Sequence, residues 1–124
     1  MNLIQQMIEN AVSGLEDKKA EDIKVIDISD VSPISDYFVL ATGSNRNQVQ
    51  AMADSVVEKM HKAGFSLKQI EGYDSANWIL MDFVDIVVHV FDRENRNFYD
   101  LERIWKDGKL VDYNRLTKEF TFLT

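Results

Sequence analysis

The stretch from 71 to 106 places the strongest constraint on how this chain can fold. It reads EGYDSANWILMDFVDIVVHVFDRENRNFYDLERIWK, and it holds both tryptophans and the densest apolar run in the sequence. Residues 77–82 and 85–92 are rich in apolar, β-branched and aromatic side chains, which is the pattern of two strands. A short acidic turn separates the two runs. The stretch therefore predicts a β-hairpin at the centre of the fold.

The turn decides which residues of the hairpin face one another. A two-residue loop at Phe83 and Val84 gives the cross-strand pairs Asp82 with Asp85, Leu80 with Val87, and Trp78 with His89. Because side chains alternate along a strand, the hairpin has two faces. One face is entirely apolar and must meet a core: Ile79, Met81, Ile86, Val88 and Val90. The other is mixed: Trp78, Leu80, Asp82, Asp85, Val87, His89 and Phe91.

This mixed face is the part of the hairpin that needs a functional explanation. A solvent-exposed face seldom presents so many large apolar side chains, and a core seldom holds two aspartates and a histidine without partners. An apolar patch rimmed by charge is typical of a protein-binding surface. The alternative is that a helix covers this face and that Trp78 belongs to the core. A one-residue slip in register would change which residues join Trp78.

The rest of the chain predicts an α/β fold with mixed, α+β character. The apolar periodicity indicates helices at 2–18, 45–63 and about 95–106, and strands at 22–28, 36–42 and 65–72. The run DYFVLAT, at 36–42, is apolar enough for a central strand, and the turn and helix after it indicate a crossover with parallel pairing. We expect about five strands in a mixed sheet flanked by helices, forming a single domain over residues 1–108. Residues 109–124 read as a C-terminal tail whose EFTFL alternation suggests an added edge strand.

The composition narrows the range of functions. The chain has 124 residues, no cysteine and a formal net charge of -7. Disulfides and thiolate zinc sites are therefore excluded, and the absence of a signal peptide or long apolar segment predicts a cytoplasmic protein with no membrane contact. Binding to phosphate backbones needs clustered basic residues, so little direct nucleic-acid contact is expected. The acidic charge fits a basic protein partner, and solubility alone is the competing explanation.

Catalytic and metal-binding patterns are weak in this sequence. Gly43 and Ser44 resemble the opening of a nucleotidyltransferase site, but those enzymes hold Mg²⁺ with carboxylates close by on one strand. The nearest acidic pair, Asp82 and Asp85, lies across a turn. The two histidines are not spaced as metal ligands, and no nucleophile elbow is present. We therefore predict no catalytic residue, no metal and no cofactor. Asn45 and Gln48 have the spacing of a helix capping box.

Four blocks, in the same order, resemble the Iojap family of ribosomal silencing factors. They are DYFVLATG (36–43), RNQVQAMAD (46–54), EGYDSANWILMDFVDIVVHVF (71–91) and FYDLERIW (98–105). The resemblance implies a fold similar to nucleotidyltransferases without their catalytic carboxylates, over the domain at 1–108. It also implies a non-enzymatic function. Family members bind large-subunit ribosomal protein fourteen, block joining of the small subunit and lower translation when nutrients are scarce.

The resemblance assigns the hairpin as the partner-binding surface. By position, the expected contact residues are Trp78, Asp82, Phe83, Asp85, His89 and Phe91, with Tyr99 adjacent. Val84 departs from the family pattern, because glycine is usual there, and a valine disfavours positive φ. Two alternatives accompany this hypothesis. One is a metal-dependent enzyme that uses Ser44 with Asp82 or Asp85. The other is self-association of the free protein into a homodimer through the same patch.

Overall fold

The fold is seen in a computed structural model that describes residues 2–30, 33, 35–96, 109–114 and 119–122, with side chains described up to residue 94. The elements in chain order are α1 (Leu3–Asp17), β1 (Glu21–Asp27), β2 (Tyr37–Gly43), α2 (Arg46–Lys62), β3 (Gln69–Glu71), β4 (Trp78–Asp82), β5 (Ile86–Asp92), α3 (Arg93–Arg96), β6 (Lys109–Asn114) and β7 (Glu119–Phe122). In the parts of the chain that the structure describes, no helix is long and apolar enough to cross a membrane.

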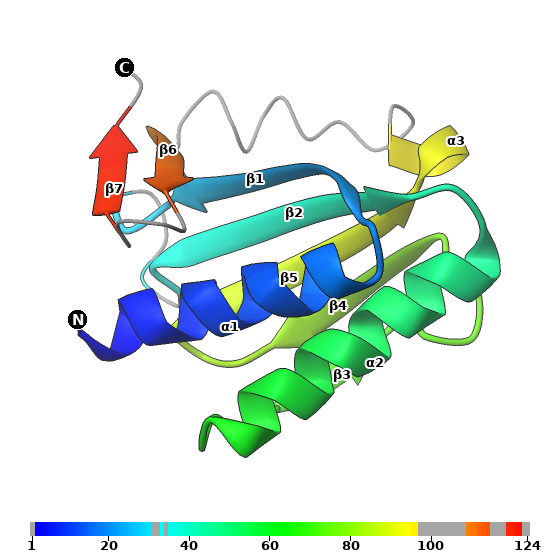
Figure 1. Ribbon diagram of the computed structural model, residues 1–124, viewed down its shortest axis with the longest axis horizontal. Coiled ribbons are helices and arrows are strands. Elements are labelled where there is room, and N and C mark those ends of the chain that lie inside the picture. Colours follow the sequence, from blue (N-terminus) through cyan, green and yellow to red (C-terminus); the bar gives the residue numbers. More distant parts are fainter. Residues whose placement is uncertain (1, 31–32, 34, 97–108, 115–118, 123–124) are drawn as a thin grey trace.

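One mixed sheet organises the molecule, as the sequence predicted. Its strand order is β3-β4-β5-β2-β1-β6-β7, and both long helices, α1 and α2, lie side by side on one face (Figure 1). The five strands predicted from the first part of the chain stand together. The segment 109–124, predicted as a tail, contributes β6 and β7, and β6 pairs with β1. The predicted helix at 95–106 falls almost wholly outside the described residues, which include only its start in α3.

The parallel pairing of β2 with β5 forms the centre of the sheet. Val39 pairs with Val88, and Leu40 pairs with His89. Side chains of alternate parity then enter two separate clusters. The larger lies under the helices and includes Val39, Ala41, Ile79, Met81, Val88 and Val90 together with residues of α1 and α2. The smaller lies on the opposite face and consists of Ile26, Ile28, Leu40 and Phe91, with Phe38 and Trp78 packed against it.

The hairpin register differs from the predicted one by two residues. Trp78 pairs with Phe91, Leu80 with His89, and Asp82 with Val87. The predicted position of the loop, at Phe83 and Val84, was wrong, because the N–H of Phe83 donates to the carbonyl of Ile86, and the N–H of Asp85 donates to the carbonyl of Phe83. Phe83 therefore faces Ile86, and the turn lies one residue later, at Val84 and Asp85. A shift of two preserves the side-chain parity, so the predicted membership of the apolar and mixed faces is confirmed over β4 and β5.

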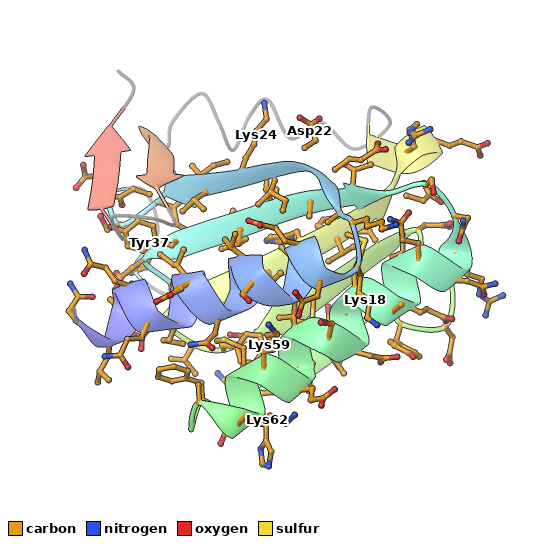
Figure 2. All side chains as sticks on the ribbon, in the orientation of Figure 1. Lys18, Asp22, Lys24, Tyr37, Lys59 and Lys62 are labelled. Carbon is orange, nitrogen blue, oxygen red and sulfur yellow. The ribbon has the colours of Figure 1, made fainter. Side chains whose placement is uncertain are left out.

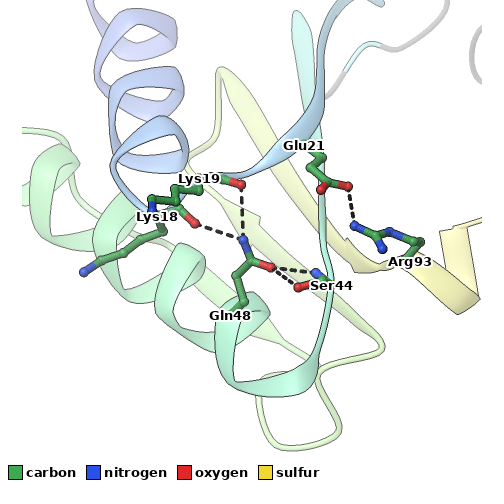
Figure 3. Close-up of polar contacts among 6 residues, drawn as sticks. All are labelled: Lys18, Lys19, Glu21, Ser44, Gln48 and Arg93. Atoms are coloured by element: carbon green, nitrogen blue, oxygen red, sulfur yellow. Dashed lines mark hydrogen bonds and ion pairs between the residues drawn. The ribbon is translucent and has the colours of Figure 1, made fainter.

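Hydrogen bonds of the Gln48 side chain connect the end of α1 to the turn that precedes α2 (Figure 3). Its side-chain oxygen accepts from the backbone N–H and the hydroxyl of Ser44, at 2.6 and 2.7 Å. Its amide nitrogen donates to the carbonyls of Lys18 and Lys19, at 3.0 and 3.2 Å. Asn45 caps α2 as predicted, accepting from the N–H of Gln48. The second half of the predicted capping box was wrong, because the Gln48 side chain is engaged with Ser44 instead.

The two helices meet closely at Gly14. A Cβ added there would lie 3.0 Å from the Cα of Val56 and 3.1 Å from the carbonyl oxygen of Ser55, both backbone atoms of α2. Beside this contact, Lys59 of α2 forms an ion pair with Asp17 at 2.7 Å. Figure 2 shows Lys59 and Lys62 along α2, on the helical side of the molecule. The absence of a side chain at position 14 therefore sets the separation of the helices.

A valine at this position tests the close helix contact. We expect Gly14→Val to lower the free energy of unfolding by about 1–3 kcal/mol, because its methyl groups overpack against the α2 backbone. Urea unfolding at neutral pH measures the change. Asn47→Val, at an exposed position of α2, is the control, and its effect should stay within about 0.5 kcal/mol. Equal stabilities of Gly14→Val and the wild type would contradict the contact.

Candidate partner-binding surface

The mixed face is buried at the centre of the sheet and becomes accessible toward the β4 edge. Phe91 is 0% exposed and His89 is 3% exposed. Trp78, Leu80 and Asp82 of β4 are each half-buried. The neighbouring strand β3 is exposed throughout. Among the described residues of this face, β4, β3 and the turn after β4 therefore form one continuous accessible edge, and Phe38 and Lys24 are half-buried on the other side of the buried centre. We call the group Trp78, Leu80, Asp82, Val84 and Asp85 the β4 patch.

Aromatic rings beneath the β4 patch hold its member Trp78 in place. The indole stacks on Phe91 with ring centroids 5.4 Å apart and an interplanar angle of 28°. Its N–H donates a hydrogen bond to Nδ1 of His89 at 3.0 Å. His89 in turn meets Phe38 edge to face, with centroids 4.6 Å apart. Such ring arrangements add stability beyond the area that they bury. Trp78 is therefore a rigid anchor, supported by the rings of Phe91 and His89, and Phe38 in turn supports His89.

The turn at the end of β4 is tightly constrained. The φ angle of Val84 is 74°, in the region that a β-branched residue seldom adopts. Three hydrogen bonds surround it. The N–H of Val84 donates to Oδ1 of Asp82 at 2.8 Å, its carbonyl accepts from the Ser35 hydroxyl at 2.8 Å, and the N–H of Asp85 donates to the carbonyl of Phe83. The turn thus presents Val84 and Asp85 outward, while Phe83 points into the helix-side core.

The loop before β4 determines where β4 begins, at Trp78. Gly72 has a φ angle of 78°, and a Cβ there would lie 2.1 Å from the carbonyl oxygen of Trp78. Only glycine fits this approach. The carbonyl of Tyr73 accepts from the Gln50 side chain at 2.9 Å, and the Tyr73 hydroxyl donates to Asp54 at 3.0 Å. Both anchors belong to α2. The helix layer therefore positions the strand whose other face carries the β4 patch.

The residues of the enzyme alternative lie at opposite ends of the sheet. Ser44 follows Gly43, which pairs with Asp92 at the end of β5, whereas Asp82 pairs with Val87 near the start of β5. Asp85 lies in the turn that precedes β5. The hydroxyl and N–H of Ser44 are also engaged with Gln48. Among the described residues, no group of three or more His, Cys, Asp or Glu is arranged to hold a metal ion. The structure therefore does not bring the proposed enzyme residues together.

The chain matches a protein family over nearly all of its length. The family model described as ribosomal silencing factor during starvation aligns with residues 2–121. The chain belongs to this ribosomal silencing factor family. Ribosomal silencing factor RsfS of Bacillus subtilis is 38% identical over 108 residues, which are 87% of this chain and 92% of the relative. The predicted family resemblance is confirmed.

Solved structures agree with this fold. The crystal structure of a Chromobacterium violaceum protein superposes with a TM-score of 0.81 at 38% identity, and the match covers 86% of this chain and 88% of that one. A more distant relative is the mouse protein named mitochondrial assembly of ribosomal large subunit protein 1. It is 34% identical over 102 residues, which cover 79% of this chain and 44% of the mouse protein.

The structure brings some of the predicted contact residues together and buries others. Trp78, Asp82 and Asp85 belong to the β4 patch. Phe83, at 3% exposure, lies in the helix-side core, and His89 and Phe91 lie beneath Trp78. Tyr99 falls outside the described residues. The sequence reasoning did not include Leu80 and Val84 among the contact residues, although strand parity placed Leu80 on the mixed face and the acidic turn contained Val84.

The strain at Val84 has a measurable consequence. We expect Val84→Gly to raise the free energy of unfolding by about 1 kcal/mol, because glycine adopts positive φ without a steric penalty. Val84 is 48% exposed, so little buried area is lost. Urea unfolding measures the difference, and Val84→Ile, which keeps the β-branch, should behave like the wild type. A less stable glycine variant would contradict a strained turn.

The buried histidine makes stability depend on pH. Burial lowers the pKa of His89 to about 4, from the ordinary histidine value of 6.5. The stability that the neutral His89 contributes is therefore complete above about pH 6.5 and is lost as the pH falls toward 4. In that range the histidine is protonated in the unfolded chain but stays neutral in the folded one. Among the described charged residues on the same face, Asp82 of β4 is a diagonal neighbour of His89. Lys24 and Glu71 lie one strand further away, beyond Leu40 and Leu80 respectively.

Comparing stabilities at two pH values isolates this contribution. Between pH 7 and 4.5, the wild type should lose about 2–3 kcal/mol more of its free energy of unfolding than His89→Asn, which cannot take up this proton. Urea titrations at both pH values measure the difference. His61→Gln, which removes an exposed histidine, is the control and should follow the wild type. The same pH dependence in His89→Asn and the wild type would show that His89 is not the group responsible.

Proposed function

We propose that this protein is a cytoplasmic ribosome anti-association factor. It binds the large ribosomal subunit through ribosomal protein fourteen and sterically blocks joining of the small subunit. Translation is thereby repressed when nutrients are scarce. The observation that carries the proposal is membership of the ribosomal silencing factor family over residues 2–121. The name of the mouse relative, which refers to assembly of the ribosomal large subunit, supports the choice of subunit.

The β4 patch has the properties that such a contact requires. Steric blocking needs no catalytic group, only a rigid surface with a few strong anchors. Trp78 supplies a large aromatic side chain held by Phe91 and His89, and tryptophan is enriched among residues that dominate binding energy. Leu80 extends the apolar area along β4. Asp82 and Asp85 add negative charge at its end, which complements a basic ribosomal protein and accelerates encounter.

A subunit-joining assay tests the function directly. Purified large and small subunits are mixed with increasing amounts of the protein, and joined ribosomes are separated by sucrose-gradient sedimentation. We expect the wild type to reduce the joined fraction in proportion to its occupancy of large subunits. Asp85→Arg should need about tenfold more protein for the same effect, since it places a positive charge against a basic partner. The defect should be largest at low salt.

Glu58→Arg is the matched control for the charge reversal. Glu58 is also exposed, but it lies on α2, on the helical side of the molecule, where it pairs with Lys62. This variant changes the net charge by the same amount and should inhibit joining as the wild type does. Wild-type protein that binds neither subunit and leaves joining unchanged would refute the proposed function. Equal inhibition by both reversed variants would remove the β4 patch from the contact.

A further inference from the structure

We propose that His89 is a positioning residue for partner binding: its Nδ1 atom fixes the indole of Trp78 in the orientation that the partner meets. This inference rests on the proposed function, because it concerns the same surface. His89 was predicted to contact the partner directly, whereas here it acts by orienting Trp78.

Two of the contacts of the Trp78 ring bear on its orientation. The direct cross-strand neighbour of Trp78 is Phe91, and stacking on this ring favours one plane for the indole. Stacking alone leaves the ring free to flip by a half-turn about the Cβ–Cγ bond, which keeps the plane but moves the N–H to the other side. The hydrogen bond from the indole N–H to Nδ1 of His89, at 3.0 Å, removes this freedom. His89 is the diagonal neighbour across the strands, at a separation that aromatic side chains can span.

The surroundings of His89 exclude it from direct contact and hold it still. The ring is 3% exposed, so almost none of its surface is available to a partner. Phe38 meets it edge to face, and Phe91 lies parallel to it within 8°, with centroids 6.3 Å apart. A side chain packed in this way can orient a neighbour precisely. Trp78, half-buried above it, is the part that remains accessible.

The protonation of His89 shows why a histidine occupies this position. Because Nδ1 accepts from the indole, the neutral ring carries its proton on Nε2. Nε2 is buried and has no hydrogen-bond partner in the part of the chain that the structure describes. A buried donor without a partner destabilises a fold, and an apolar residue of similar size would avoid that cost. The hydrogen bond to Trp78 accounts for the histidine, whereas packing alone does not.

A fixed indole binds more tightly than a mobile one. A partner that meets a side chain already held in one orientation does not have to order it, and this saving appears as affinity. One hydrogen bond of this kind corresponds to about a threefold to tenfold change in the dissociation constant. The effect should depend entirely on the indole N–H. It should therefore vanish when residue 78 has no such group.

A double-mutant cycle tests this dependence. Dissociation constants for purified large subunits are measured by co-sedimentation for His89→Leu and His89→Asn, each alone and combined with Trp78→Phe. Asparagine can place its side-chain oxygen where Nδ1 stands. We expect His89→Leu to weaken binding about threefold to tenfold, and His89→Asn to bind nearly as the wild type does. In the Trp78→Phe background, both substitutions should leave the dissociation constant unchanged.

The indole N–H signals provide a second measurement that needs no ribosome. The chain has two tryptophans, so ¹H–¹⁵N spectra contain two indole signals, and Trp78→Phe identifies the one from Trp78. We expect this proton to exchange slowly with solvent in the wild type and in His89→Asn, and at least tenfold faster in His89→Leu. Urea unfolding of each variant confirms that the compared proteins are folded.

The outcomes separate this inference from the proposed function. Wild-type protein that does not co-sediment with large subunits refutes the proposed function, and the inference with it. If the wild type binds but His89→Leu weakens binding equally in both backgrounds, His89 acts independently of Trp78 and only the inference fails. Unchanged exchange of the Trp78 indole proton in His89→Leu also overturns the inference. The inference is supported if His89→Leu weakens binding only when residue 78 is tryptophan and His89→Asn binds nearly as the wild type does.

Discussion

The parallel pairing of β2 with β5 is the contact on which the rest of the structure depends. It joins two apolar strands and directs their alternate side chains to opposite faces, Val88 toward the helices and His89 away from them. β1 adds to one side of this pair and β4 to the other. The position of β4 next to β5 brings Trp78 over His89 and Phe91. The accessible patch is therefore a consequence of how the buried centre is paired.

Hydrophobic periodicity predicted the fold class because it shows which side chains share a face of a strand, and that assignment survives a register error of an even number of residues. The predicted hairpin placed Trp78 opposite His89, whereas Phe91 occupies that position. The error was an even number of residues, so each side chain kept its face. The nearly continuous apolar run of β2 likewise identified the central strand without any knowledge of its neighbours. The parallel partner of β2, by contrast, was β5 rather than the strand directly after α2.

Features that depend on individual hydrogen bonds could not be read from the sequence. Phe83 belongs to an acidic, turn-like segment, yet its ring lies in the helix-side core, because its N–H bond to the carbonyl of Ile86 extends the strand alternation of Ile79 and Met81 by one more residue. The indole–imidazole bond required the true register, since Trp78 and His89 are diagonal rather than direct neighbours. The engagement of Gln48 with Lys18 and Lys19 joins segments that no local pattern connects. Family resemblance predicted the surface, and geometry shows which of its residues are accessible.

The central pairing also imposes an order on biosynthesis. Tyr37 pairs with Ile86, so the middle of the sheet cannot close until β5 has left the ribosomal exit tunnel. Until then β2 has an open edge on the side away from β1. Pairings between distant segments close slowly, because the loop entropy is lost before the contacts are gained. During its own synthesis, each molecule thus depends on late-emerging residues, and an interrupted chain would leave the apolar strand β2 without its parallel partner.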